Sequence, residues 1–299
     1  MKIYDCFQFY DEEMLLDLRL NIMDKYVDKF VITEATYSHN GKGKKLIFDI
    51  KNFSKFKDKI IYIVVDQQPA DLFKIEESDK DKHDTRGQKL ILNGYKRDNF
   101  QRQMAIKALK HADENDFIII NDIDEIPNLK NVELNKIKNK LIIFKQKIFY
   151  YKFNLLYKNV PWYGSRICKK RNLISPQWLR DIKHKKYPLW RFDIIFSKKK
   201  YNDIYYIDEG GWHFTNVKTA EDIEKKLLNY THHDEFEKSG LNATDLKKKI
   251  VEKKIIYDHN VDQKSYKWGS EITLQTVGLP EMPDYLRENY IKYSNWLEN

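Results

Sequence analysis

The chain has 299 residues, of which 54 are Lys or Arg and 45 are Asp or Glu, so its formal net charge is +9. Although 33% of the residues are charged, 41% are hydrophobic and 14% are aromatic, which excludes a disordered chain. This length predicts one large domain, or a core domain with a smaller appendage.

Membrane insertion and export are both disfavoured. The longest apolar runs, 60–65 and 117–120, have the length of strands, whereas a membrane-spanning helix needs about 20 residues. Asp5 interrupts the N-terminal stretch where a signal peptide would be apolar. With only Cys6 and Cys168, a disulfide framework is excluded. We therefore expect a cytoplasmic protein.

The first 125 residues alternate between strand patterns and helix patterns. Apolar runs predict strands at Lys2–Phe7, Lys29–Glu34, Lys59–Val65 and Asp116–Asn121, and helical periodicity predicts helices at Glu12–Met23 and Arg97–Ala112. The polar range Asp66–Lys96 is typical of a long loop or an active-site lid. Strands and helices in this order predict an α/β fold with a mostly parallel sheet.

The pattern changes after residue 140. Leu141–Phe153 is typical of a long β-hairpin or an edge strand, and a basic stretch follows it. Beyond this, we expect short strands at Phe192–Phe196 and Ile204–Ile207, the segment Gly210–Phe214, and helices at Ala220–Asn229, Ala243–Lys254 and Asp284–Leu297. No linker of Gly/Ser or Pro-rich type divides the chain, so we predict a core of residues 1–218 with a helical extension, 219–299, packed on it.

The positive charge is local. Residues 141–200 contain 16 basic residues and two acidic ones, Asp181 and Asp193, and the rest of the chain is net negative. Only nine of the 54 basic residues are Arg, which indicates that part of the charge reflects a Lys-rich composition. The remainder predicts an anionic partner, such as nucleic acid, an acidic membrane or a phosphorylated molecule.

One motif suggests a metal site. Asp122 and Asp124 follow the apolar run 117–120, and they lie on the same side of an extended backbone because side chains alternate. They are expected at the carboxyl edge of the sheet, where α/β proteins bind ligands. Two carboxylates leave room for water and phosphate around Mg²⁺ or Mn²⁺. The alternative is an acidic turn that caps a helix over Asn131–Lys138.

Four segments together resemble glycosyltransferase family 17. They are Phe9–Arg19 (FYDEEMLLDLR), Val27–Ala35 (VDKFVITEA), Asn121–Pro127 (NDIDEIP) and Gly210–Phe214 (GGWHF). Pro283–Tyr290 (PDYLRENY) is similar to the family's closing helix. The resemblance covers most of the chain in the right order, which makes it stronger than any single motif.

The resemblance implies an A-type glycosyltransferase fold, Rossmann-like, with a helical C-terminal portion. It also implies inverting sugar transfer from a nucleotide sugar, for which we expect UDP-GlcNAc, with Mn²⁺ or Mg²⁺ on the diphosphate. Asp122 and Asp124 match the family's metal-binding Asp-x-Asp, and Glu125 matches the acid that follows. His213 matches a further metal or diphosphate contact, with a core histidine as the alternative, and Glu34 matches an acid that could face the nucleotide.

Transfer requires groups that stabilise the leaving diphosphate and accept a proton. Arg166 and Arg180, in the basic stretch, are our candidates for the cations, and either could instead be a surface charge. Glu125 is the acid that we assign to catalysis. The general base stays open, since neither Glu209 nor Asp181 matches a family motif.

The acceptor and two rival functions also stay open. The chain begins at its first strand with no anchor or stem, so we expect a bacterial or viral enzyme acting on a polysaccharide, a lipid-linked glycan or a glycoprotein. A Mg²⁺-dependent phosphoryl or nucleotidyl transferase would need further carboxylates. A basic, aromatic-rich nucleic-acid-binding module would stack bases on Tyr and Trp, but no recognised nucleic-acid motif is present, so we expect no nucleic-acid partner.

Overall fold

The structure is a computed structural model that describes residues 1–81, 85–185, 187–188, 190–194, 196–258, 268 and 271–298. Its strands are β1 (Ile3–Phe9), β2 (Lys29–Ala35), β3 (Ile60–Val65), β4 (Phe117–Ile120), β5 (Glu125–Pro127), β6 (Leu141–Phe144), β7 (Gln146–Tyr150), β8 (Leu155–Trp162), β9 (Arg166–Lys169), β10 (Ile204–Ile207), β11 (Gly211–Thr215) and β12 (Gln275–Thr276). Its α-helices are α1 (Glu13–Met23), α2 (Thr85–Gln103), α3 (Pro176–Asp181), α4 (Ala220–Asn229), α5 (His233–Ser239), α6 (Ala243–Val251) and α7 (Asp284–Glu288). None of the helices in these ranges is long and apolar enough to cross a membrane.

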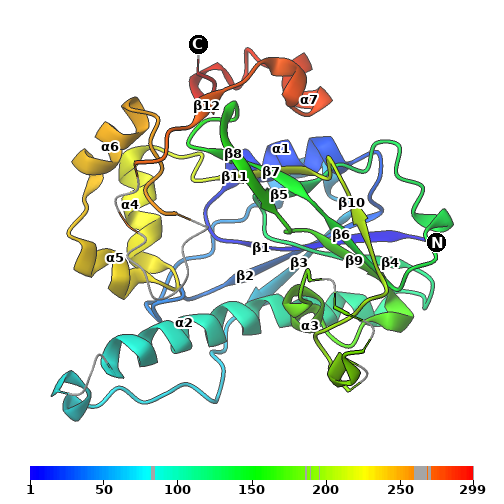
Figure 1. Cartoon of the computed structure of the whole chain (residues 1–299), viewed down its shortest axis with the longest axis horizontal. Helices are drawn as coiled ribbons and strands as arrows, with labels where there is room; N and C mark the ends of the chain where they lie inside the picture. The colour runs from blue at the N-terminus through cyan, green and yellow to red at the C-terminus, as the bar shows by residue number, and fades with distance from the viewer. Residues whose placement is uncertain are drawn as a thin grey trace.

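The larger sheet confirms the predicted α/β class. Within the described residues it has seven strands in the order β10-β6-β9-β4-β1-β2-β3. The strands β3, β2, β1 and β4 run parallel, while β9 runs antiparallel to β4 and β6. Helices α1 and α2 lie on opposite sides of the parallel strands (Figure 1). This is a Rossmann-like, parallel-rich sheet covered on both faces.

Alternating side chains of the parallel strands build two separate hydrophobic cores. In β1, Phe7 and Phe9 pack in one cluster with residues of α1, whereas Tyr4 and Cys6 pack in the other cluster on the opposite face. Residues 117 and 119 of β4 are divided from residues 118 and 120 in the same way. Because both faces are buried, these strands read as nearly continuous apolar runs in the sequence.

The prediction of a hairpin or edge strand over Leu141–Phe153 is wrong. The segment forms β6 and β7, which belong to different sheets and are separated by Lys145 alone. The chain passes from the larger sheet to the second sheet again between β10 and β11. Lys145 bonds to both ends of that connection: its N donates to Ile207 O (3.0 Å), and its O accepts from Gly210 N (2.8 Å). A local apolar pattern predicts a strand but does not identify its neighbours.

The second sheet has five strands among the described residues, in the order β12-β8-β7-β11-β5. β11 runs antiparallel to β5, with Gly211 opposite Pro127 and His213 opposite Glu125. On its other side β11 runs parallel to β7. This sheet therefore brings the segment around residue 213 against the end of the acidic motif, 88 residues earlier in the chain.

The predicted loop over Asp66–Lys96 is wrong in its second part, because α2 already begins at Thr85. The predicted helix Arg97–Ala112 is the end of α2 followed by a 3₁₀ helix, Met104–His111. Polar residues of early α2 bond to other segments: Asn93 accepts from Phe73 N (2.7 Å) and donates to Phe73 O (2.8 Å). Such bonds hold a helix that has no clear apolar period.

The predicted strand Phe192–Phe196 is also wrong. Phe192–Ile194 form a 3₁₀ helix, and Ile195 lies outside the described residues. The side chains of Trp190 and Phe192 are 73% and 72% exposed, so no neighbouring strand covers them. Apolar side chains alone do not make a strand without a sheet to bury them.

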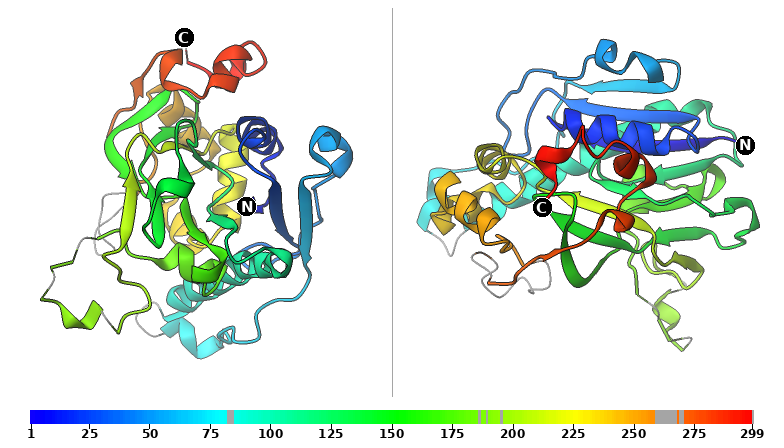
Figure 2. Two further views of the ribbon diagram at one scale, coloured as in Figure 1. Left: turned by 90° about the vertical axis from the view of Figure 1, so that its right-hand side faces the viewer. Right: turned by 90° about the horizontal axis from the view of Figure 1, so that it is seen from above.

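The C-terminal region contains more than helices. α4 has the predicted bounds, but α6 ends at Val251 and α7 at Glu288, short of the predicted helix ends, and β12 pairs with β8. Helices α4, α5 and α6 gather at one end of the molecule (Figure 2) and pack on apolar residues of β7 and β8. Leu286 of α7 joins the core cluster of α1. The boundary at residue 218 stays a prediction.

Gly211 should not tolerate a side chain. Its φ is +120°, and a Cβ there would collide with Ile126 O and lie 2.7 Å from Asn128 N, both backbone atoms of the neighbouring segment. We expect Gly211→Ala to cost about 3 kcal/mol of unfolding free energy, measured by urea denaturation. Gly240→Ala is the control, since Gly240 also has positive φ (+70°) but meets no atom within 4 Å. Equal losses in the two variants would contradict the collision argument.

Candidate functional site

An open cavity of about 240 Å³ lies at the carboxyl ends of β1, β2 and β4. We call it the first cavity. Its lining combines strand ends with α2, with α4 and with the residues that follow α4, namely Gln8, Phe9, Tyr10, Glu12, Tyr37, His39, Asp98, Gln101, Arg102, Asp122, Ile123, Asp124, Lys226, Asn229, Tyr230 and Thr231. It thus contains both aspartates of the predicted motif, at the sheet edge where such folds bind ligands.

A buried arginine of α1 holds the motif in place. Arg19 is fully buried and donates two bonds to Asp5 (2.6 and 2.9 Å). It also donates to Asn121 Oδ1 (2.5 Å) and, through Nη1, to the backbone oxygens of Asp122, Ile123 and Glu125 (2.8–3.2 Å). Because one guanidinium binds three carbonyls of the same turn, the aspartates leave the strand in a fixed direction.

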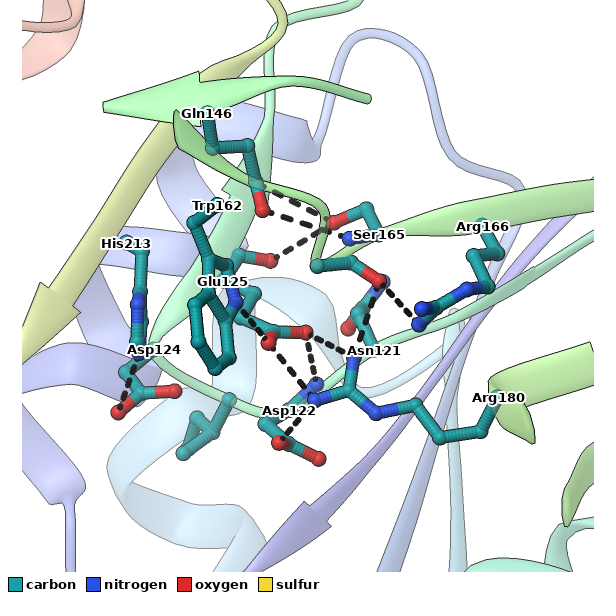
Figure 3. A network of polar contacts seen from close by, with 12 residues as sticks. Asn121, Asp122, Asp124, Glu125, Gln146, Trp162, Ser165, Arg166, Arg180 and His213 are labelled. Carbon is teal, nitrogen blue, oxygen red and sulfur yellow. Dashed lines mark hydrogen bonds and ion pairs between the residues drawn. The ribbon is translucent and has the colours of Figure 1, made fainter. Parts of the chain in front are cut away.

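The pairing of β5 with β11 sets His213 beside Asp124. The His213 Nε2 lies 3.6 Å from Asp124 Oδ2, and Phe214 N donates to Asp124 O (2.8 Å). On the other side, Trp162 stacks on the His213 ring with centroids 4.6 Å apart. His213 Nδ1 is buried and has no hydrogen-bond partner among the described residues. The predicted metal ligands Asp124 and His213 are therefore brought together (Figure 3).

Asp122 has a different environment, because two arginines bind it. Arg180 Nη2 donates to Asp122 Oδ2 (2.7 Å), and Arg102 Nη2 donates to Asp122 Oδ1 (3.0 Å). Arg180 also forms a two-fold ion pair with Glu125 (2.7 and 2.8 Å), as Figure 3 shows. Glu125 is fully buried and accepts further bonds from Trp162 Nε1 (2.5 Å) and Asp122 N (3.0 Å). Arg180 is the centre of this ion-pair cluster.

These charges lower the pKa of both aspartates. Burial alone would raise the pKa of Asp122, but the positive charges of Arg180 and Arg102 outweigh it and hold the pKa well below its usual value. For Asp124, burial is likewise outweighed by His213, and its pKa is also lowered. Both side chains are therefore ionised at neutral pH.

The lowered pKa of Asp122 predicts acid sensitivity. A carboxylate whose pKa is lower in the folded state stabilises the fold above its unfolded pKa, about 3.9, and this contribution is lost as the pH falls through and below that value. In urea unfolding, the drop in unfolding free energy between pH 6 and pH 3 should be smaller in Asp122→Asn by about 1 kcal/mol. An unchanged drop would show that Asp122 is not ion-paired in the folded protein.

The donor set of the site suits a hard divalent cation in part. Asp124 and His213 offer an oxygen and a nitrogen that face each other, whereas both oxygens of Asp122 bind arginines. In the described part of the chain, no group of three or more His, Cys, Asp or Glu side chains is arranged to hold a metal. The residues present therefore fit an ion that takes two protein ligands and completes its shell from substrate phosphate and water.

A second cavity, about 370 Å³, adjoins the ion-pair cluster from the side of β8 and α3. It is lined by Val160, Pro161, Trp162, Tyr163, Arg166, Arg180 and His184. Arg166 and Arg180, our candidates for the diphosphate cations, line this second cavity and do not line the first. The basic groups of the first cavity are instead Arg102 and Lys226, with His39.

The other predicted site residues lie outside both cavities. Glu34 is fully buried, and its oxygens accept from Lys44 Nζ (2.5 Å), Ile47 N (2.8 Å), Phe48 N (3.1 Å) and Tyr62 OH (2.8 Å). It therefore fastens the segment 44–48 to the sheet. Asp181 pairs with Lys199 (2.5 Å), and Glu209 is exposed and pairs with Lys147 (2.6 Å). Neither candidate base lines the first or the second cavity.

Sequence reasoning missed four residues of the site. Asp98 and Arg102 are four residues apart, a spacing that indicates an ion pair on a helix, and the structure has this pair at 3.1 Å. The spacing does not indicate the further bond from Arg102 to Asp122. Arg19 ends the segment Phe9–Arg19, but nothing in the sequence indicates that its guanidinium binds Asp5 and the acidic motif. Trp162 and Lys226 carry no local signal, because their positions beside Glu125 and in the first cavity depend on β8 and α4.

The chain shows distant similarity to solved structures. HddC from Yersinia pseudotuberculosis is 12% identical over 70% of this chain and 92% of its own, with a TM-score of 0.33. A protein described as a glucose-1-phosphate thymidylyltransferase from Bacillus anthracis, in complex with a sucrose, is 10% identical over 71% of this chain and 88% of its own, with a TM-score of 0.35. Neither substrate nor reaction follows from scores of this size. No curated protein matches the chain.

The family comparison is decisive. The model of glycosyltransferase family 17 matches residues 1–298, and so confirms the resemblance seen in the four separate segments. Among the functions considered above, it favours glycosyl transfer over nucleotidyl transfer and over nucleic-acid binding. The chain belongs to glycosyltransferase family 17 and is a glycosyltransferase.

Proposed function

We propose that the protein transfers a sugar, GlcNAc, from a UDP-sugar to a hydroxyl of a glycan, with inversion at the anomeric carbon and with Mn²⁺ or Mg²⁺ bound. The observation that carries this proposal is the facing pair of Asp124 and His213 beside the first cavity. An Asp-x-Asp segment directly after a parallel strand also supports an A-type fold for the chain.

The first cavity would bind the donor. The half-buried rings of Tyr10 and Tyr230 would give this cavity a surface on which a uracil base can stack. Lys226 of α4 and Arg102 of α2 would supply positive charge that attracts the diphosphate. The donor site would therefore lie between the sheet edge and these two helices.

Asp124 and His213 would hold the divalent cation at the diphosphate. When bound, the cation would neutralise the negative charge that develops on the leaving phosphate. Asp122 would act differently from the original prediction, because its oxygens bind Arg102 and Arg180 and so orient those two cations. The chain's own contribution is thus a fixed set of charges, and such preorganised charges stabilise a transition state without reorganising.

The second cavity would admit the acceptor. The ion-pair cluster separates the two cavities, since Asp122 lines the first, Arg180 lines the second, and the two side chains are bonded at 2.7 Å. Inversion requires an acceptor hydroxyl to approach the anomeric carbon from the side opposite the leaving group, and the second cavity would provide that approach. Glu125 would hold Arg180 and Trp162 in position at this boundary.

Donor turnover tests the proposal. The purified chain should hydrolyse UDP-GlcNAc slowly with Mn²⁺, and UDP should raise its melting temperature by mass action. EDTA should abolish both effects, and NMR of the transfer product should show the inverted anomer. The matched control is UDP-glucose, which differs in the acetamido group only. Binding of UDP that is unaffected by EDTA would overturn the metal assignment, and a product with retained configuration would overturn inversion.

A further inference from the structure

Arg166 differs from the other buried arginines in its charge balance. Arg19 is paired with Asp5, Arg102 with Asp98 and Asp122, and Arg180 with Asp122 and Glu125. Arg166 is only 7% exposed, yet no carboxylate among the described residues lies within ion-pair distance of it. Its guanidinium donates from Nη1 to Gly164 O (3.0 Å), and its Nε is buried with no hydrogen-bond partner.

A buried charge without a counterion is costly. Removing a guanidinium from water is unfavourable unless an anion or several hydrogen bonds compensate. Burial, together with the nearby charge of Arg180, lowers the pKa of Arg166 to about 9, although the charges of Glu125 and Asp122 act in the opposite direction. Burial also lowers the pKa of His184, with further contributions from Arg166, Lys185 and Lys183. The carboxylates of Glu125 and Asp122, which are both paired with Arg180, therefore compensate only part of the cost of burying Arg166.

The surroundings of Arg166 suit a sugar. Arg166 lines the second cavity, where the rings of Trp162 and Tyr163 are also part of the wall. Tyr163 stacks on His184 with centroids 4.3 Å apart and planes within 10°, which fixes both rings. Aromatic rings offer flat apolar surface to the C–H face of a pyranose, and a guanidinium offers paired N–H donors to a carboxylate or a phosphate.

We propose that the second cavity binds an acidic sugar of the acceptor, whose carboxylate or phosphate group pairs with Arg166 while its ring lies against Trp162 and Tyr163. This inference rests on the proposed function, because it names the acceptor class of that site. The same anion chemistry could come from the donor diphosphate, but the lining of the first cavity includes the aspartates and not Arg166.

The test compares two probes that differ only at C6, methyl β-D-glucuronide with a carboxylate and methyl β-D-glucoside with a hydroxymethyl group. Each is titrated into the full chain with saturating UDP and Mn²⁺ and followed by ligand-observed NMR. The wild-type chain should bind the glucuronide at least about tenfold more tightly, as a charge-assisted pair predicts. Arg166→Gln should abolish this preference, whereas Arg166→Lys, which keeps the charge, should retain part of it. Arg171→Gln, at an exposed arginine outside the cavity, is the matched control.

Each remaining outcome is decisive. Equal affinity for the two probes in the wild type, or an unchanged preference in a folded Arg166→Gln variant, would overturn the inference. A tenfold loss of UDP affinity in Arg166→Gln would show that Arg166 serves the donor diphosphate, and would overturn it as well. If the wild-type chain bound UDP but did not prefer the acid, the inference alone would fail. Absence of UDP binding would overturn the proposed function together with it.

Discussion

Asp124→Asn should lower kcat/KM for the UDP-sugar by about 10³-fold, because the proposed function places this charge where the diphosphate would leave. Asp124 is the carboxylate that faces His213 at 3.6 Å and lines the first cavity. The loss of its charge should also weaken Mn²⁺ binding. Steady-state kinetics and Mn²⁺ titration of UDP binding measure the two effects.

Asp122→Asn is the matched control for this change. Its carboxylate oxygens bind Arg180 and Arg102, so the variant should keep most of its Mn²⁺ affinity while losing stability at neutral pH. Equal losses of Mn²⁺ affinity in the two variants would restore the original prediction that both aspartates hold the metal. Unchanged Mn²⁺ affinity in Asp124→Asn would contradict the pairing with His213 as the metal site.

Arg180→Met should destabilise the fold by about 3–5 kcal/mol, the usual cost of leaving a buried partner charge uncompensated. Arg180 is bonded to both oxygens of the fully buried Glu125 and to Asp122. Without Arg180, the carboxylates of Asp122 and Glu125 would lose the positive charge that lies between them. Urea denaturation at pH 7 gives the loss directly.

A double-mutant cycle separates the ion pair from simple packing. Adding Glu125→Gln to Arg180→Met removes the uncompensated charge, so the double variant should be more stable than Arg180→Met alone. Arg191→Met, at an exposed pair with Asp193, should leave the unfolding midpoint unchanged. Additive losses at residues 125 and 180 would show that the two side chains do not stabilise each other.

Most parallel strands could be predicted from the sequence because their apolar runs are local. β2 and β3 lie within one residue of the predicted bounds, and α4 matches its prediction. The failures share a cause. The N-terminal half of α2 is held by polar bonds such as that between Asn93 and Phe73, and the strand partners of β6 and β7 depend on Lys145 crossing between sheets. Neither leaves a periodic trace in the sequence.

The sequence alone determined the family, the acidic motif and the basic character of residues 141–200, because each of these depends on residues that are neighbours in the chain. Only the tertiary structure separated the functions of these charges. Pairing of β5 with β11 joined Asp124 to His213, while α2 and α3 brought Arg102 and Arg180 to Asp122. The positive charges of Arg102 and Arg180 are neutralised by carboxylates of the motif. The buried Arg166, in contrast, has no carboxylate partner within ion-pair distance among the described residues. Charges act over a few ångströms, so their partners are decided by the fold.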